Sequence, residues 1–185
     1  LDYSGYMKVR EHFYKNKIES EEIFIFLDEA SVTATENILI FAASQPVKTV
    51  IYNAACEPHV QNLCSLLIKM GAEIEGIGSN RLVVQGKTKL DGTDHTIGPD
   101  HIEIGSFIAL AAATKSKFRI SGIEKEHMIK INQVFSSMGV NYYFDENNII
   151  VPENQELKIK KDFGGAVPKI DDGIWPAFPA DLTSV

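Results

Sequence analysis

The sequence predicts a mixed α/β fold built from repeated units of helix and strand. Two similar stretches recur 68 positions apart, where Met70-Gly71 and Met138-Gly139 each end an apolar-periodic segment. Downstream, residues 80–84 (NRLVV) match residues 148–152 (NIIVP) at the same offset. A repeat of this length is one supersecondary unit, and such a unit cannot bury its apolar face alone. We therefore expect about two and a half stacked units in the chain.

The first unit has the predicted order β-α-β-α-β-β. Residues 22–27 are rich in aromatic and branched side chains, which is typical of a buried strand. Ser31 or Thr33 then caps a helix that runs through about Ser44 and stops before Pro46. The remaining elements are a strand at 48–53, a helix from Pro58 to Gly71, and strands at 72–75 and 82–84 joined through residues 78–80.

The second unit is predicted to repeat this order. Its elements are a strand at 93–97, a helix from 99–100 to about Thr114, a strand at 118–120, a helix at 124–138, and strands at 141–144 and 148–151 around a turn at 146–147. A third unit is expected to start near residues 157–160 and to be cut off after residues 175–185. Residues 86–98 are rich in Gly, Asp, Thr and Lys, so we predict the border between two domains there.

Composition excludes some classes of function. The net charge of −7 argues against nucleic acid or an anionic membrane as the main partner, and a hydrophobic content of 44% is sufficient for a core. Cys56 and Cys64 are too few for a metal cluster or a disulfide framework, so we expect a reducing cytoplasm.

Two candidate sites lie at predicted helix starts in the first unit. Residues 31–37 place small polar side chains and free backbone N–H groups where an anion can bind, but an ordinary helix cap is the favoured interpretation. Cys56 and His59 could form a thiolate–imidazole pair, but their spacing does not establish a contact, and an ordinary helix entry is favoured.

A third candidate is the helix start at residues 99–106. His101 is an available proton carrier there. The favoured interpretation has Asp100 as the helix cap, Glu103 as its capping-box partner and His101 as a solvated residue of the first turn.

The fourth candidate is the loop at residues 175–181, in which two prolines hold the backbone extended. Asp181 either caps a helix that begins at Leu182 or acts as a general base on a rigid loop. The pattern leaves both interpretations open.

Five segments carry a resemblance to a known family. They are residues 31–37, similar to Ser-Val-Gly-Ala-Thr-x-x-Ile; 53–58, similar to Asn-Ala-Ala-Arg/Lys-Glu-Pro; 67–72, similar to Leu-x-x-Met/Leu-Gly-Ala; 99–106, similar to Pro-Asp-Arg-Ile-Glu-x-Gly-Thr; and 176–181, similar to Pro-x-Phe-Pro-Thr-Asp. In this order they resemble the UDP-N-acetylglucosamine 1-carboxyvinyltransferase family of enolpyruvyl transferases.

The resemblance implies a fold and a reaction. The fold has two pseudo-symmetric domains, each an inside-out α/β barrel of three β-α-β-α-β-β units, present here only in part. Residues 1–92 would be the C-terminal part of the first domain and residues 93–185 the start of the second. The reaction transfers enolpyruvyl from phosphoenolpyruvate to the 3-hydroxyl of UDP-N-acetylglucosamine and releases phosphate, in peptidoglycan precursor synthesis. No redox cofactor or metal is implied.

The resemblance also assigns roles to residues. Asp181 matches the aspartate near the sugar 3-hydroxyl, which is the proposed base. Ser31 and Val32 match nucleotide-sugar contacts near the diphosphate and the uridine, and Glu57 matches a polar residue of the interdomain cleft.

Four positions depart from the family motifs. Thr33, beside the expected diphosphate, stands where the family has Gly, and Glu29 stands where a basic residue is usual. Cys56 replaces Arg or Lys, and His101 replaces Arg among the expected substrate-binding residues. Three losses of positive charge should weaken binding of two anionic substrates.

Two other functions stay open. The chain could be a relative of the 5-enolpyruvylshikimate-3-phosphate synthases, which share the fold, or a non-catalytic nucleotide-sugar-binding or scaffold protein. Because the expected half-built domains lack unit neighbours, we also expect exposed apolar faces and self-association through them.

We expect the purified chain to release no phosphate from phosphoenolpyruvate and UDP-N-acetylglucosamine. The sequence has no counterpart of the family's Cys-bearing loop, its N-terminal Lys-Asn pair or its C-terminal arginines, which clamp phosphoenolpyruvate. A phosphate-release assay with a heat-killed control checks this, and release above that control would contradict it.

Overall fold

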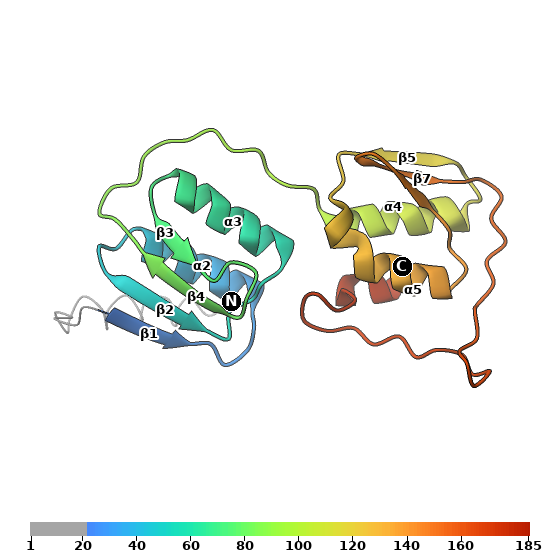
Figure 1. Cartoon of the computed structure of the whole chain (residues 1–185), viewed down its shortest axis with the longest axis horizontal. Helices are drawn as coiled ribbons and strands as arrows, with labels where there is room; N and C mark the ends of the chain where they lie inside the picture. The colour runs from blue at the N-terminus through green and yellow to red at the C-terminus, as the bar shows by residue number, and fades with distance from the viewer. Residues whose placement is uncertain (1–21) are drawn as a thin grey trace.

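The computed structural model describes residues 22–185, which form two α/β halves joined by an extended segment (Figure 1). The elements of the first half are β1 (Glu22–Phe26), α2 (Val32–Ala43), β2 (Lys48–Tyr52), α3 (Pro58–Lys69), β3 (Glu73–Glu75) and β4 (Arg81–Gln85). Its sheet has the strand order β1-β2-β4-β3, in which β1 and β2 are parallel and the other neighbours are antiparallel. This half confirms the predicted order β-α-β-α-β-β.

The second half has a smaller sheet. Its elements are α4 (His101–Ala113), β5 (Phe118–Ser121), the 3₁₀ helix η1 (Lys125–Met128), α5 (Ile129–Ser137), β6 (Tyr143–Asp145), β7 (Asn148–Val151) and the 3₁₀ helix η2 (Ala180–Ser184). The strand order is β5-β7-β6, with both pairs antiparallel. Buried side chains of α4 and α5 pack with those of β7 in one core.

The repeat read in the sequence reappears in the strand pairing. In each half a strand is followed by a helix and a hairpin whose last strand pairs with the first, which gives β2-β4-β3 and β5-β7-β6. Both Met-Gly pairs end a helix, and Gly71 (φ +110°) and Gly139 (φ +87°) adopt the left-handed conformation that favours glycine. The predicted α/β class is confirmed, whereas the inside-out barrel stays an expectation.

Three predicted elements differ from the structure. Residues 93–97 form no strand: Ile97 is 84% exposed and the imidazole of His95 is bonded to the side chain of Asn62. Residues 157–160, near which a third unit was expected to start, contain no helix or strand, and the Lys160 N–H donates to the Ser137 carbonyl at the end of α5. The helix expected at 124–138 begins as η1 and becomes α-helical at α5.

Each half has its own hydrophobic core. Leu39, Ile51, Val60 and Leu82 are fully buried in the first half, and Ile108, Met128, Ile131 and Ile149 in the second. Residues 86–100, which join the halves, contain no helix or strand. This is the stretch in which the sequence predicts a domain border; residues 1–21 of the predicted first domain lie outside the described residues.

Large apolar side chains are also exposed on the described surface, as expected. Phe24 and Phe26 on β1 are 63% and 74% exposed, and Phe107 and Leu110 on α4 are 43% and 47% exposed. Self-association through such faces stays a prediction. Within residues 22–185, no helix has both the length and the apolar content needed to cross a bilayer.

Gly86 fixes the junction between β4 and the extended segment. A Cβ atom at this position would lie 2.0 Å from the Ala42 carbonyl oxygen and 2.4 Å from that of Gln45. The chain comes this close because the Lys87 N–H donates to the Ala43 carbonyl at the end of α2. Only glycine leaves room for that approach.

Gly86→Ala should therefore lower the free energy of unfolding by about 2–3 kcal/mol, because the new methyl group meets backbone atoms that cannot turn away. Gly92→Ala is the matched control, since a Cβ there meets nothing within 4 Å. Urea denaturation of both variants measures the difference, and equal stabilities would show that the junction tolerates a side chain.

Candidate functional site

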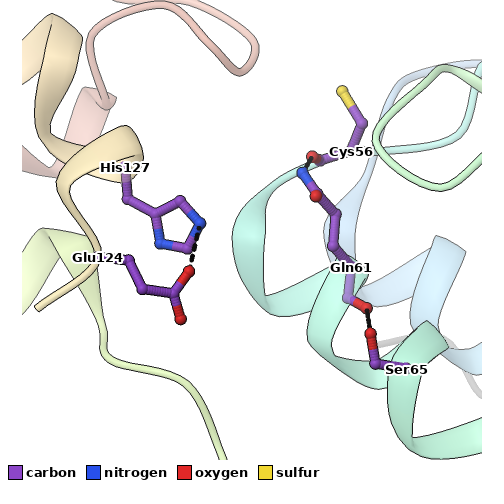
Figure 2. Close-up of polar contacts among 5 residues, drawn as sticks. All are labelled: Cys56, Gln61, Ser65, Glu124 and His127. Carbon is purple, nitrogen blue, oxygen red and sulfur yellow. Dashed lines mark hydrogen bonds and ion pairs between the residues drawn. The ribbon is translucent and has the colours of Figure 1, made fainter. Parts of the chain in front are cut away.

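A cavity of about 490 Å³ lies between the two halves. One wall is α3, and the other is formed by the extended segment and the starts of α4 and η1. Figure 2 shows Glu124 and His127 on one side, facing Gln61 and Ser65 on the other. The lining includes Pro58, Gln61 and Ser65 on the first wall, and His101, Glu124 and His127 on the second.

The start of α3 forms the rim of the first wall. Pro58 is the first helical residue, as predicted, and the preceding Glu57 makes no capping hydrogen bond with its side chain. Instead the Gln61 amide donates to the Cys56 carbonyl at 2.8 Å (Figure 2). One carboxylate oxygen of Glu57 is buried with no hydrogen-bond partner among the described residues. A buried carboxylate oxygen of this kind can accept a hydrogen bond from a further donor.

The start of α4 confirms Asp100 as a helix cap. Its carboxylate accepts from the backbone N–H groups of Ile102 and Glu103, at 2.8 and 3.3 Å. The favoured interpretation of His101 as a solvated residue is wrong, because its side chain turns inward and is 3% exposed. Burial lowers the pKa of His101, the nearby Asp100 carboxylate opposes this, and His127 and His59 add to the lowering.

Trp175 connects the two halves beside this cavity. Its ring packs edge-on against His101 at 5.2 Å and against His127 at 5.8 Å, measured between ring centroids. Its carbonyl oxygen accepts a hydrogen bond from the Cys56 thiol of the first half at 3.7 Å. The thiol keeps its proton, since burial and the adjacent Glu57 both raise the pKa of Cys56. These contacts disfavour the thiolate–imidazole pair considered for Cys56 and His59.

The start of α2 confirms Ser31 as a helix cap, whose hydroxyl accepts from the Ala34 N–H at 3.3 Å. Buried Thr35 donates to the Ser31 carbonyl at 2.8 Å and accepts from the Ala55 N–H at 2.9 Å. This pair of bonds ties the start of α2 to the loop before α3. The polar side chain of Thr33 is exposed nearby, so the cap leaves this surface open to a ligand.

Asp181 lies on η2 and is exposed. The residue before η2 is Pro179, so Asp181 falls inside the first turn and does not cap a helix from Leu182. Its position is fixed by its neighbours: Phe178 packs against Phe135, and Leu182 is buried. An exposed carboxylate on an anchored turn retains the capacity to accept a proton.

The structure separates the predicted site residues. His101 lines the cavity, whereas Ser31, Val32, Thr33, Glu57 and Asp181 do not. Sequence reasoning missed His127 and Gln61, and it singled out Trp175 only as part of the candidate loop at residues 175–181. The contact between His127 and Trp175 joins distant parts of the chain, so no local pattern pointed to it.

Helix starts therefore meet at a polar cavity in an α/β fold with a repeated β-α-β-β core. The chain belongs to the EPSP synthase (3-phosphoshikimate 1-carboxyvinyltransferase) family, whose model matches residues 5–184. It is 53% identical over 170 residues to UDP-N-acetylglucosamine 1-carboxyvinyltransferase of Borreliella burgdorferi, with 92% of this chain and 39% of the relative covered. The relative of the same name in Treponema denticola is 49% identical over 173 residues, with 94% and 40% covered.

These relatives confirm the resemblance read from the five segments. The chain spans about 40% of their length. Among solved structures, the enolpyruvyl transferase NikO from Streptomyces tendae matches with a TM-score of 0.62 at 20% identity, over 74% of this chain and 36% of that one. At this identity the match shows a shared fold.

Cys56 should react slowly with iodoacetamide near neutral pH, because its raised pKa leaves less thiolate than in a free thiol. The rate of Cys56 alkylation should still rise with pH at values where the alkylation rate of glutathione, the free-thiol reference, has become constant. Mass spectrometry of a Cys64→Ser variant isolates the Cys56 adduct. Alkylation faster than glutathione at neutral pH would instead indicate an activated thiolate.

Proposed function

We propose that this chain is part of an enzyme that transfers enolpyruvyl from phosphoenolpyruvate to the 3-hydroxyl of UDP-N-acetylglucosamine, in the cytoplasmic synthesis of peptidoglycan precursors. The observation that carries the proposal is the match to relatives of that name, at about half identity over more than nine-tenths of this chain. In this proposal residues 1–92 belong to one domain and residues 93–185 begin a second. Their separate sheets and cores support that division.

The nucleotide sugar would bind along the facing ends of the two halves. Three family segments begin helices, with Ser31, Glu57 and Asp100 at the positions just before α2, α3 and α4. In Figure 1, β1 and β2 point toward the second half, and α4 begins on the side nearest the first half. A helix start carries a partial positive charge, and the N–H groups that its cap leaves unbonded can donate to a diphosphate.

In the proposed roles, Ser31, Val32 and Thr33 bind the nucleotide end of the sugar, with Glu57 and His101 farther along the ligand. Asp181 accepts the proton of the 3-hydroxyl as it attacks phosphoenolpyruvate. A base must come within about 2.6–3.2 Å of the hydroxyl that it deprotonates. Exposure of the Asp181 carboxylate on an anchored turn supports this role.

A titration of the ¹⁵N-labelled chain tests the proposal. UDP-N-acetylglucosamine should shift the amide signals of residues 31–33 and of Asp181 with one common dissociation constant, because one ligand spans both halves. UDP alone should shift the amide signals of residues 31–33 and leave the amide signal of Asp181 unchanged. Binding of shikimate 3-phosphate without binding of UDP-N-acetylglucosamine would favour the shikimate branch of the family, and binding of neither would contradict both.

Glu29→Lys should tighten UDP-N-acetylglucosamine binding about tenfold, because one charge-assisted contact to a diphosphate contributes roughly 1.4 kcal/mol or more. Glu29 is exposed two positions before Ser31, so the change need not disturb the fold. Glu153→Lys, at an exposed position after β7, is the control with the same change in charge. Equal affinities of the two variants would place the diphosphate elsewhere.

A further inference from the structure

All four histidines of the described residues gather between the two halves. His59, His101 and His127 line the cavity. The Nε2 atom of His95 lies 3.0 Å from the side-chain oxygen of Asn62, which lines the same wall of α3. The chain's one tryptophan, Trp175, packs against two of these rings. Because an imidazole can change its charge near neutral pH, the packing of the His101 and His127 rings on the indole depends on protonation.

Trp175 is held from both sides. In the second half, the rings of His101 and His127 meet the indole at interplanar angles of 71° and 85°, which is the edge-to-face arrangement that aromatic rings prefer. In the first half, the Cys56 thiol donates to the Trp175 carbonyl. The residue therefore joins the entry of α3 to the start of α4.

The loop between Trp175 and Asp181 links the position of the indole to the position of the Asp181 carboxylate. The Ala177 N–H donates to the Ile174 carbonyl at 2.9 Å, and the Gly173 N–H donates to the Phe178 carbonyl at 3.1 Å. Phe178 itself is 2% exposed. The loop is therefore supported at both ends: at Trp175 by the two histidine rings and the Cys56 thiol, and at Phe178 by the core of the second half. Loss of the Trp175 contacts removes one of these two supports of the turn that carries Asp181.

Protonation opposes this packing. His101 is buried, and a cation there loses its hydration. Asp100 faces it from the same helix start and favours the charged form, whereas His127 on η1 and His59 on α3 disfavour it. At the start of η1, the carboxylate of Glu124 lies 3.2 Å from the Nε2 atom of His127.

Two of the departures from the family motifs lie at this contact. Positions 56 and 101, where the family has basic residues, both touch Trp175. The Cys56 thiol donates to the Trp175 carbonyl and the His101 ring packs edge-on against the indole, so both departures bear on the placement of Trp175.

We propose that Trp175 is a positioning residue that joins the two halves and holds the turn of Asp181, and that protonation of His101 releases it. The importance of the Asp181 turn rests on the proposed function. The joining of the two halves by Trp175 does not depend on that function, and each claim has its own test.

The emission of Trp175 is the direct readout, because the chain has one tryptophan. Release moves the indole from its packed site into water, which shifts its emission to longer wavelengths. The emission maximum should therefore move to longer wavelengths as the pH is lowered, with a midpoint below the ordinary histidine value of about 6.5, since the pKa of His101 is lowered. His101→Gln should remove this transition. His59→Gln, on the opposite wall without a ring contact to Trp175, should keep it.

An emission maximum that stays constant down to the pH at which the native chain unfolds, or a full transition retained in His101→Gln, would overturn the proposal. Circular dichroism at each pH separates release of the indole from unfolding. If His101→Gln does not fold, acrylamide quenching of Trp175 in the native chain still decides the outcome. Quenching must increase as the pH is lowered, because a released indole is more accessible to acrylamide.

The amide signal of Asp181 tests the positioning. Cys56→Ala should shift it and should increase acrylamide quenching of Trp175, with the exposed population rising about twofold, as expected for losing one hydrogen bond from a weak donor. Ser65→Ala is the control, because Ser65 lines the same cavity and bonds to the Gln61 carbonyl. An unchanged Asp181 signal in Cys56→Ala would overturn the positioning role. Failure of UDP-N-acetylglucosamine to bind the native chain would instead contradict the proposed function alone.

Discussion

The way each helix begins is the constraint on which the rest of the structure depends. The first N–H groups of a helix have no partner within it and must be satisfied from outside. Ser31 and Asp100 satisfy them with side-chain oxygens, and Pro58 removes one of the donors. Thr35 then links the start of α2 to the loop before α3. The same segments that build the helix starts are the family segments, so the folding role and the proposed binding role fall on the same residues.

Local structure could be predicted from the sequence because it depends on neighbours in the chain. Pro58 and the two Met-Gly pairs define helix ends through backbone conformation, and Asp100 does so through hydrogen bonds from its carboxylate to N–H groups two and three positions on; the structure confirms them. The strand predicted at 93–97 failed for the opposite reason. A strand requires a partner strand, and in the second half β5 pairs with β7, while residues 93–97 are taken up by a contact of His95 with α3.

The candidate site was predicted less completely, because its central contacts join distant parts of the chain. His101 was expected in solvent, since a polar residue in a first turn usually faces water. It is buried because Trp175, far along the sequence, covers it. Cys56 and Trp175 meet across 119 positions, and no local pattern encodes such a contact. The sequence shows that positions 56 and 101 carry a thiol and an imidazole, but it does not show that both contact Trp175.

Packing also explains why two family segments far apart in the sequence occur together. Gly105 lies inside α4, where glycine normally destabilises a helix by up to about 1 kcal/mol. A Cβ atom at this position would lie 2.6 Å from a methyl carbon of Leu182. The glycine thus lets η2 approach α4 and seats Leu182 in the core, next to Asp181. The glycine of one segment and the aspartate of the other are therefore parts of a single arrangement, in which the helix gives up intrinsic stability so that the turn carrying the carboxylate has a fixed place.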